Sequence, residues 1–258
     1  MPHFPLVTRL VDAKQQLSDD VVTERFYSPP DDGAPLLRVN FVTSIDGAVE
    51  VSGTTAALSS PTDQWIMGLL RRQCDAVLLG AGTLRAEAYG PLSLDERGRA
   101  WRRHHGKPEH PILVVVSGSL DLDPGSRVFR EAPVRPIVLT HSLAPAARRQ
   151  ALEPVADVLT VGHRTVDLAA AVSLLHDRGL RQILAEGGPH LLGGLTAADL
   201  VDELCLTISP VLTGAGAGRI TAGRASPLRH LTLRQVLAAD SFLLLRYQRE
   251  SHTSTPPR

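Results

Sequence analysis

Short apolar segments that alternate with helical patterns are the feature that most constrains how this chain of 258 residues can fold. Each segment is almost continuously apolar, which is typical of parallel strands covered on both faces. Between the segments, apolar residues recur at the spacing of an amphipathic helix. The pattern predicts an α/β domain with a mostly parallel central sheet and helices on both faces. The expected strands span 37–43, 75–79, 112–116, 136–140, 155–161 and 182–185, and the expected helices span 61–72, 165–176 and 189–198, with one more starting near 144.

The C-terminal part of the chain follows a different pattern. Strands are expected at 201–208, 231–237 and 241–248, with no helical pattern between them. Strands that follow one another without crossover helices pair antiparallel. The sequence therefore predicts an antiparallel C-terminal edge on the sheet.

The domain organisation is expected to be simple. Residues 1–36 are irregular and are interpreted as an N-terminal extension of a single domain at 37–250. The polar tail at 251–258 has nothing to bury and is expected to be disordered. The stretch 93–110 is rich in Arg, His and Gly, which predicts a long surface loop.

Two helix starts can be assigned from capping chemistry. Ser60 supplies a hydroxyl N-cap, Pro61 suits the first helical position, and Asp63 places an acid in the first turn. Thr165 is expected to cap the helix that ends near His176. These assignments fix where two of the predicted strand-to-helix connections end.

Two glycine-bearing turns follow predicted strands, at the edge where ligands bind in open α/β sheets. The first, Gly80-Ala81-Gly82-Thr83, lacks the third glycine of a dinucleotide fingerprint, so a tight turn and a ligand contact are both open. The second, Glu186-Gly187-Gly188-Pro189, lets an anion approach the backbone at a helix start. It is a candidate pyrophosphate cradle, and the alternative is an ordinary strand-to-helix turn.

A third turn, Ser44-Ile45-Asp46-Gly47, follows the first predicted strand. An acid followed by glycine after a strand is typical of a plain turn. The functional alternative is a loop that closes over a substrate or a nicotinamide.

Charge and cysteine content exclude several classes of protein. The chain has 27 basic and 27 acidic residues, so nothing electrostatic favours a nucleic-acid partner. No window approaches the roughly 20 apolar residues of a membrane helix, and no secretory leader is apparent. Cys74 and Cys205 are expected to be buried thiols, and no zinc-ligand motif is present. We therefore expect a cytoplasmic protein without a membrane partner or a metal.

Three of these segments occur together in the order found in one known family. The segments are NFVTSIDG at 40–47, DAVLLGAGT at 75–83 and ILAEGGP at 183–189. They resemble the pyrimidine reductases of riboflavin biosynthesis, the reductase half of the bifunctional deaminase–reductase. Asp202-Glu203-Leu204, followed by Ser209-Pro210 and Gly214, also fits the family pattern.

The resemblance implies a dihydrofolate-reductase-like fold, NADPH as hydride donor, a homodimer and a small-molecule substrate. The family reduces the ribosyl group of a ribosylamino-pyrimidinone 5′-phosphate to a ribityl chain. Hydride transfer also requires a proton, for which Glu87 is the first candidate and Asp46 the second. The cofactor-binding residues implied are Gly80, Ala81, Gly82, Thr83, Ser117, Glu186, Gly187 and Gly188, and the substrate-binding residues are Asn40, Ser44, Ser60, Gln64 and Glu87.

The sequence departs from the family in the substrate half. Gln64 stands where the family has an arginine, and Ala86-Glu87-Ala88-Tyr89 replaces Ala-Asp-Asp-Pro and its following arginine. The zinc deaminase signatures are absent. Three functions therefore stay open: reduction of the ribosylamino-pyrimidinone or a related pyrimidine, reduction of dihydrofolate or a pterin, and non-catalytic binding of NADP.

Overall fold

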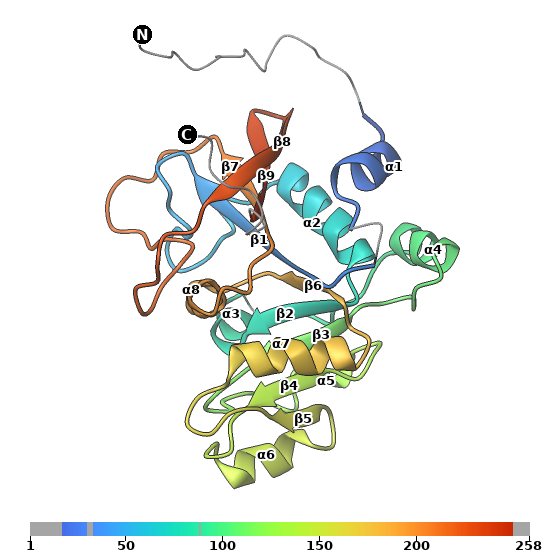
Figure 1. Cartoon of the computed structure of the whole chain (residues 1–258), viewed down its shortest axis with the longest axis vertical. Helices are drawn as coiled ribbons and strands as arrows, with labels where there is room; N and C mark the ends of the chain where they lie inside the picture. The colour runs from blue at the N-terminus through green and yellow to red at the C-terminus, as the bar shows by residue number, and fades with distance from the viewer. Residues whose placement is uncertain (1–16, 30–32, 88, 250–258) are drawn as a thin grey trace, which may run out of the picture.

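A computed structural model describes residues 17–29, 33–87 and 89–249 (Figure 1). The strands are β1 Leu36–Ser44, β2 Ala76–Gly80, β3 Ile112–Val116, β4 Ile137–Thr140, β5 Asp157–Thr160, β6 Gln182–Ala185, β7 Glu203–Ser209, β8 Leu231–Ala239 and β9 Phe242–Arg249. In the described residues they form one nine-stranded sheet of order β5-β4-β3-β2-β6-β1-β7-β9-β8. All pairs from β5 to β7 are parallel, and β9 pairs antiparallel with both β7 and β8. The predicted fold class is confirmed, including the antiparallel C-terminal edge.

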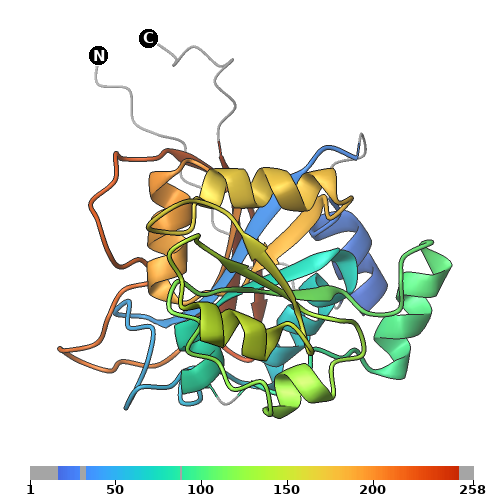
Figure 2. The same cartoon turned by 90° about the horizontal axis from the view of Figure 1, so that it is seen from below.

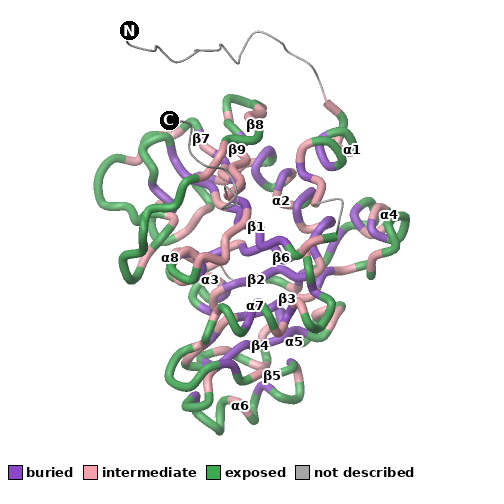
Figure 3. Tube along the Cα trace, in the orientation of Figure 1, coloured by how far each residue is buried: buried purple, intermediate pink, exposed green. Residues whose placement is uncertain are grey.

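Helices cover both faces of the sheet (Figures 1 and 2). The α-helices are α1 Asp19–Val21, α2 Pro61–Gln73, α3 Ala81–Ala86, α4 Glu96–His104, α5 Arg127–Arg130, α6 Ala146–Leu152, α7 Leu168–Asp177 and α8 Pro189–Ala197. Apolar side chains of α2, α3, α5 and α6 pack on one face. Those of α7 and α8 pack on the other. The central strands are therefore buried on both sides, as Figure 3 shows, which explains their continuous apolar sequences.

The stretch 93–110 is not a long irregular loop, because α4 lies within it. Asp95 caps the helix by accepting a hydrogen bond from the Gly98 N–H at 2.7 Å. Arg102 is almost fully buried, and its guanidinium donates to the Arg72 and Cys74 carbonyls at the end of α2. The charged composition of this stretch suggested a surface loop. In the structure, its arginines instead donate to main-chain carbonyls or form ion pairs at the surface.

The described part of the N-terminal extension contains helical structure that was not expected. Ser18 caps α1, which continues into a turn of π-helix at Val22–Phe26. Val22 and Tyr27 are buried in the core cluster on the α2 side of the sheet. The described part of this extension is therefore an integral part of the domain. Residues 1–16, and the tail expected at 251–258, lie outside the described residues.

One predicted cap is wrong and another is confirmed. Asp167, not Thr165, caps α7 by accepting the Ala170 N–H at 3.0 Å. Ser60 caps α2 as expected, accepting the Asp63 N–H at 3.2 Å. Among the described residues, no helix is long and apolar enough to cross a membrane.

Candidate active site

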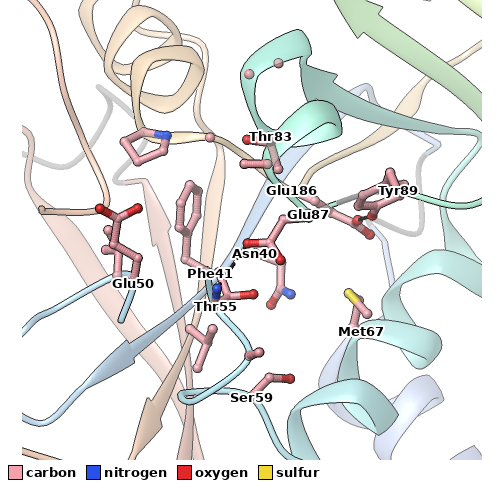
Figure 4. Close-up of a pocket in the computed structure, with 18 of the residues that line it drawn as sticks. Asn40, Phe41, Glu50, Thr55, Ser59, Met67, Thr83, Glu87, Tyr89 and Glu186 are labelled. Atoms are coloured by element: carbon pink, nitrogen blue, oxygen red, sulfur yellow. Dashed lines mark hydrogen bonds between the residues drawn. The ribbon is translucent and has the colours of Figure 1, made fainter. Parts of the chain in front are cut away.

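A cleft of about 800 Å³ opens where β1, β2 and β6 end. Its walls come from segments far apart in the sequence, as Figure 4 shows: Asn40 and Phe41 from β1, Met67 from α2, and Thr83 from α3. In an open α/β sheet the carboxyl ends of neighbouring parallel strands meet at one edge. That topology brings the glycine turns and the helix α2 side chains into one cavity.

The two glycine turns are joined to each other along one wall. The Gly80 N–H donates to the Gly187 carbonyl at 2.7 Å, and the Glu186 N–H donates to the Leu78 carbonyl at 3.1 Å. The Gly187–Gly188 peptide bond is cis, and Gly187 has φ +100°. A Cβ on Gly188 would lie 2.5 Å from the Thr83 hydroxyl oxygen. Side chains are therefore excluded from this junction.

The helices that leave these turns both begin without a side-chain cap. Gly80 is the N-cap of α3 and Gly188 is the N-cap of α8, and neither can offer a side-chain acceptor. The N–H groups of each first turn are thus available to an anionic ligand; in α8 they begin at His190, because Pro189 has no N–H. Gly82 and Thr83 line the cleft from α3, and a Cβ on Gly82 would meet nothing. This wall fits a pyrophosphate, which needs backbone donors and close approach.

Glu186 has a second function that its sequence position did not reveal. Its carboxylate receives two hydrogen bonds of 2.6 Å from Arg71, and the Tyr89 hydroxyl donates to the same group. Burial acts to lower the Arg71 pKa, but the adjacent carboxylate raises it above the ordinary value. Burial, followed by the charge of Glu186, holds the Tyr89 pKa well above its usual range. The three groups form a fixed, satisfied ion-pair cluster at the back of the cleft.

Glu87 lies at the end of α3 and faces the cleft. One carboxylate oxygen accepts the Thr55 backbone N–H at 3.1 Å. Figure 4 shows Glu87 and Asn40 both directed into the cavity, with Met67 on the α2 side. Asn40 is 9% exposed and holds its amide at this surface. Together they offer acceptors, and one amide donor, to a polar heterocycle.

Asp46 lies outside this cleft lining, at an exposed turn. Its carboxylate accepts the Gly214 N–H at 2.8 Å and the Thr213 N–H at 3.1 Å, and the Ser44 hydroxyl also donates to it. These bonds, led by the one from Ser44, lower the Asp46 pKa from 3.8 to about 2. A carboxylate held ionised in this way is poorly suited to donate a proton. It links the β1 turn to the segment after β7.

The start of α2 contributes Gln64, Ser60 and Asp63 in different ways. Gln64 is exposed and lines the cleft, whereas the Ser60 hydroxyl caps the helix by accepting the Asp63 N–H. Asp63 is 6% exposed and accepts the Ser59 hydroxyl at 2.9 Å. Burial raises the pKa of Asp63, and hydrogen bonds from Ser59 and Thr207 offset part of that rise.

Ser117 is buried at the end of β3, one strand beyond the cleft lining. Its hydroxyl oxygen accepts the Leu120 N–H at 3.0 Å, which orders the turn that follows the strand. Arg85 and Arg148 donate to the carbonyls of Asp121 and Ser119 in the same turn. Among the described residues, no cluster of three or more His, Cys, Asp or Glu side chains could hold a metal ion.

The cleft thus brings together only part of the expected site. The lining includes Asn40, Gln64, Gly80, Gly82, Thr83, Glu87, Glu186 and Gly188, and excludes Ser44, Asp46, Ser60, Ala81, Ser117 and Gly187.

The sequence interpretation missed Phe41, Asp63, Met67, Arg71 and Tyr89 among the lining residues. One signal for two of them was present. Gln64, Met67 and Arg71 are spaced three and four residues apart, which places them on one face of a helix. No signal in the sequence relates Tyr89 or Phe41 to that face.

Comparisons with known proteins agree with this fold. Residues 35–245 match the family model of the RibD C-terminal domain. The chain is 29% identical over 194 residues to the 2,5-diamino-6-ribosylamino-4(3H)-pyrimidinone 5′-phosphate reductase of Archaeoglobus fulgidus, covering 75% of this chain and 84% of that protein.

Two solved structures are similar as well. A pyrimidine reductase-like protein of Corynebacterium diphtheriae is 27% identical, with a TM-score of 0.82 over 91% of this chain and all of that one. The riboflavin biosynthesis reductase of Saccharomyces is 18% identical, with a TM-score of 0.66 over 90% of this chain and all of that one, a likeness of fold alone. The resemblance inferred from the three sequence segments is confirmed. The chain belongs to the RibD C-terminal domain family.

Proposed function

We propose that this protein is an NADPH-dependent reductase of a ribosylamino-pyrimidinone or a closely related pyrimidine. One observation carries the proposal: two uncapped helix starts, joined through glycine turns, face the same cleft as Glu87 and Asn40. An anion-binding wall beside a polar substrate wall is what a hydride transfer between two bound molecules requires. The archaeal relative is named as a reductase of a ribosylamino-pyrimidinone 5′-phosphate.

The wall formed by the turns Gly80–Thr83 and Glu186–Pro189, called the glycine wall below, would hold the pyrophosphate of the dinucleotide. The first-turn N–H groups of α3, and those of α8 from His190 onward, would donate to it, and Gly82 and Gly188 would permit close approach. The nicotinamide supplies the hydride when the cofactor is bound. Phe41, at the junction of the turns, provides an apolar surface in the cleft.

The turn after β3 would distinguish NADPH from NADH. Ser117 orders this turn, and the Arg85 and Arg148 side chains beside it are about half exposed. Exposed guanidinium groups suit a 2′-phosphate through charge-assisted hydrogen bonds. Calorimetry with both nucleotides tests this assignment. Equal affinity for NADPH and NADH, or no change in that preference in Arg148→Ala, would remove it.

Glu87 would hold the substrate and relay a proton to it. In Glu87→Gln, the amide oxygen can still accept the Thr55 N–H, so the local structure should survive. Losing an acid–base group typically lowers turnover by about 10²–10⁴-fold. Steady-state NADPH oxidation with the pyrimidine substrate, followed across pH, measures this effect. The matched control is Glu131→Gln, which changes an exposed carboxylate remote from the cleft lining. Unchanged kcat and an unchanged pH profile would exclude Glu87 from this function.

The same assay decides between the remaining functions. Dihydrofolate and related pterins enter as competing substrates, since they are reduced on the same fold. Faster NADPH oxidation with a pterin than with any pyrimidine would replace the proposed substrate. Tight NADPH binding with no reduction of either class would instead indicate a non-catalytic binding protein.

The protein would form a homodimer through one face of the antiparallel part of its sheet. Residues paired directly across an antiparallel ladder lie on one face. On one face of β7, β9 and β8, the paired positions are all apolar and none is fully buried. Leu233 and Leu243 are 45% and 40% exposed. The face consists of Leu204, Leu206, Ile208, Leu233, Val236, Ala238, Leu243, Leu245 and Tyr247.

Apolar sheet faces of this extent are typical of contact surfaces, and sheets pack face to face through such side chains. Light scattering on the purified chain should give the mass of two copies. Leu243→Glu should shift it to one copy, whereas Leu143→Glu, at an exposed leucine elsewhere, should not. A monomeric wild-type protein would exclude the dimer.

The buried, free thiols Cys74 and Cys205 support a location in the reducing cytoplasm.

A further inference from the structure

The cleft carries an excess of negative charge. Its described lining includes the exposed carboxylate Glu50 and the half-buried carboxylate Glu87, the buried carboxyl groups of Asp63 and Glu186, and one guanidinium, Arg71. His190 is the remaining basic side chain in the lining, and it belongs to the first turn of α8, at the glycine wall. Away from the backbone N–H groups of the glycine wall, side chains of one charge repel ligands of the same charge and concentrate ligands of the opposite charge.

Arg71 is not available as a counter-ion for a substrate anion. Two of its guanidinium nitrogens donate to the Glu186 carboxylate at 2.6 Å, and that carboxylate is 5% exposed. Removing Arg71 from this pair would leave a buried carboxylate uncompensated, which is strongly unfavourable. The pair therefore contributes no net positive charge to the cleft.

The start of α2 is also closed to an anion. The Ser60 hydroxyl already accepts the Asp63 N–H, and the Ser60 carbonyl accepts the Gln64 N–H at 2.9 Å. Asp63 itself places a carboxylate in this first turn, and Asp240 accepts the Thr62 hydroxyl at 2.8 Å. Acidic side chains thus stand where a helix start would otherwise favour a phosphate. The uncapped starts of α3 and α8 remain, and the proposed function assigns those to the cofactor.

We propose that the substrate of this cleft carries no phosphate group and is a neutral or cationic heterocycle rich in N–H donors. The inference rests on the proposed reductase function. It separates this chain from its archaeal relative, whose name specifies a 5′-phosphate. A phosphate monoester carries a charge of about −1.5 to −2 at neutral pH. Placing it among these carboxylates without a free guanidinium is unfavourable, while amino and ring N–H groups would find acceptors at Glu87 and Asn40.

The test compares one compound in two forms. The ribosylamino-pyrimidinone 5′-phosphate and its phosphatase-treated product are each supplied to the NADPH-loaded full chain. We expect kcat/KM to be higher for the dephosphorylated form by on the order of tenfold or more, the scale of like-charge repulsion. An equal or higher kcat/KM for the phosphorylated form would overturn the inference while leaving the proposed function intact.

Binding measurements keep the two proposals distinguishable if neither form is reduced. Calorimetry with the oxidised cofactor present then compares the two compounds directly. Tighter binding of the dephosphorylated form would support the inference and end the proposed function. Tighter binding of the phosphorylated form, or binding of neither, would overturn both.

A charge variant supplies an independent readout. Gln64→Arg adds a guanidinium at an exposed position of the cleft lining, on the turn that already contains Asp63. It should raise the kcat/KM ratio of phosphorylated to dephosphorylated substrate several-fold, and added salt should weaken this gain. Ser173→Arg adds the same charge at an exposed site on α7, outside the cleft lining, and should leave the ratio unchanged. An equal change of the ratio in both variants would count against a charge-selective cleft.

Discussion

The two walls of the cleft are built from different parts of the polypeptide. The glycine wall presents backbone N–H groups at the starts of α3 and α8, where side chains would collide or block approach. The opposite wall presents side chains from β1, α2 and the end of α3. A backbone site depends on chain path, which the fold determines, whereas a side-chain site changes with each substitution. The first wall can therefore stay constant in a family while the second changes its ligand.

The side-chain wall has one group on which the stability of the domain depends. Replacing Arg71 with methionine should lower the free energy of unfolding by about 3–5 kcal/mol, because Glu186 would be left buried without its partner. Urea denaturation measures this change. The control is Arg127→Met, which breaks an exposed pair with Glu131 and should cost about 0–1 kcal/mol. If the free energy of unfolding falls no more in Arg71→Met than in Arg127→Met, the buried pair does not stabilise this wall.

The backbone wall should respond to a single added methyl group. Gly82→Ala meets no atom in the protein, and alanine favours a helix over glycine by about 0.5–1 kcal/mol, so stability should hold or rise. If the dinucleotide approaches this turn, its dissociation constant should increase about tenfold, or about 1.4 kcal/mol. Calorimetry with NADPH measures it. Gly68→Ala, at an exposed glycine on α2 outside the cleft lining, should leave affinity unchanged. Unaltered affinity in Gly82→Ala would place the cofactor elsewhere.

Asp46 tests the turn beside the cleft, with the smallest expected effect. Its pKa is about 2 in the folded protein and 3.8 ordinarily, so the folded state favours the ionised form. The stabilisation is therefore present above about pH 4 and is lost as the pH falls through about 2. Asp46→Asn should unfold more readily than wild type at neutral pH, and the difference should shrink in acid. Thermal unfolding at pH 7 and at pH 3 provides the comparison. A difference that grows in acid would contradict this account.

The course of the parallel sheet could be predicted because each strand is buried on both faces. β3 coincides with its expected bounds, and β6 does too, since the apolar run and the strand are the same residues. The helix α2 was found from its cap and its first-turn proline. Capping and continuous burial are local properties, so they can be read along the chain.

Helix α4 and the N-terminal helix were missed for a physical reason. Each begins at a local cap, Asp95 or Ser18, but each also depends on contacts with α2: Arg102 donates to carbonyls at its end, and Arg72 donates to the Asp19 carbonyl. Such contacts join residues about 30 to 50 positions apart, and a pattern within one segment does not contain them. Composition alone therefore suggested loops.

The sequence by itself determined the fold class, the antiparallel edge, the positions of the two glycine turns and the family. Those features depend on which residue types stand close together in the sequence. They are the apolar runs of the strands, the glycines that allow close backbone contact, and the helix start after each turn. Only the tertiary structure decided which side chains face the cavity. It paired Glu186 with Arg71, 115 positions away, and placed the Asp46 carboxylate in hydrogen bonds with the Thr213 and Gly214 N–H groups. It also placed four acidic side chains in one cleft with a single guanidinium, which is already paired with Glu186. The charge of a cleft depends on residues from several segments, and only folding brings those segments together.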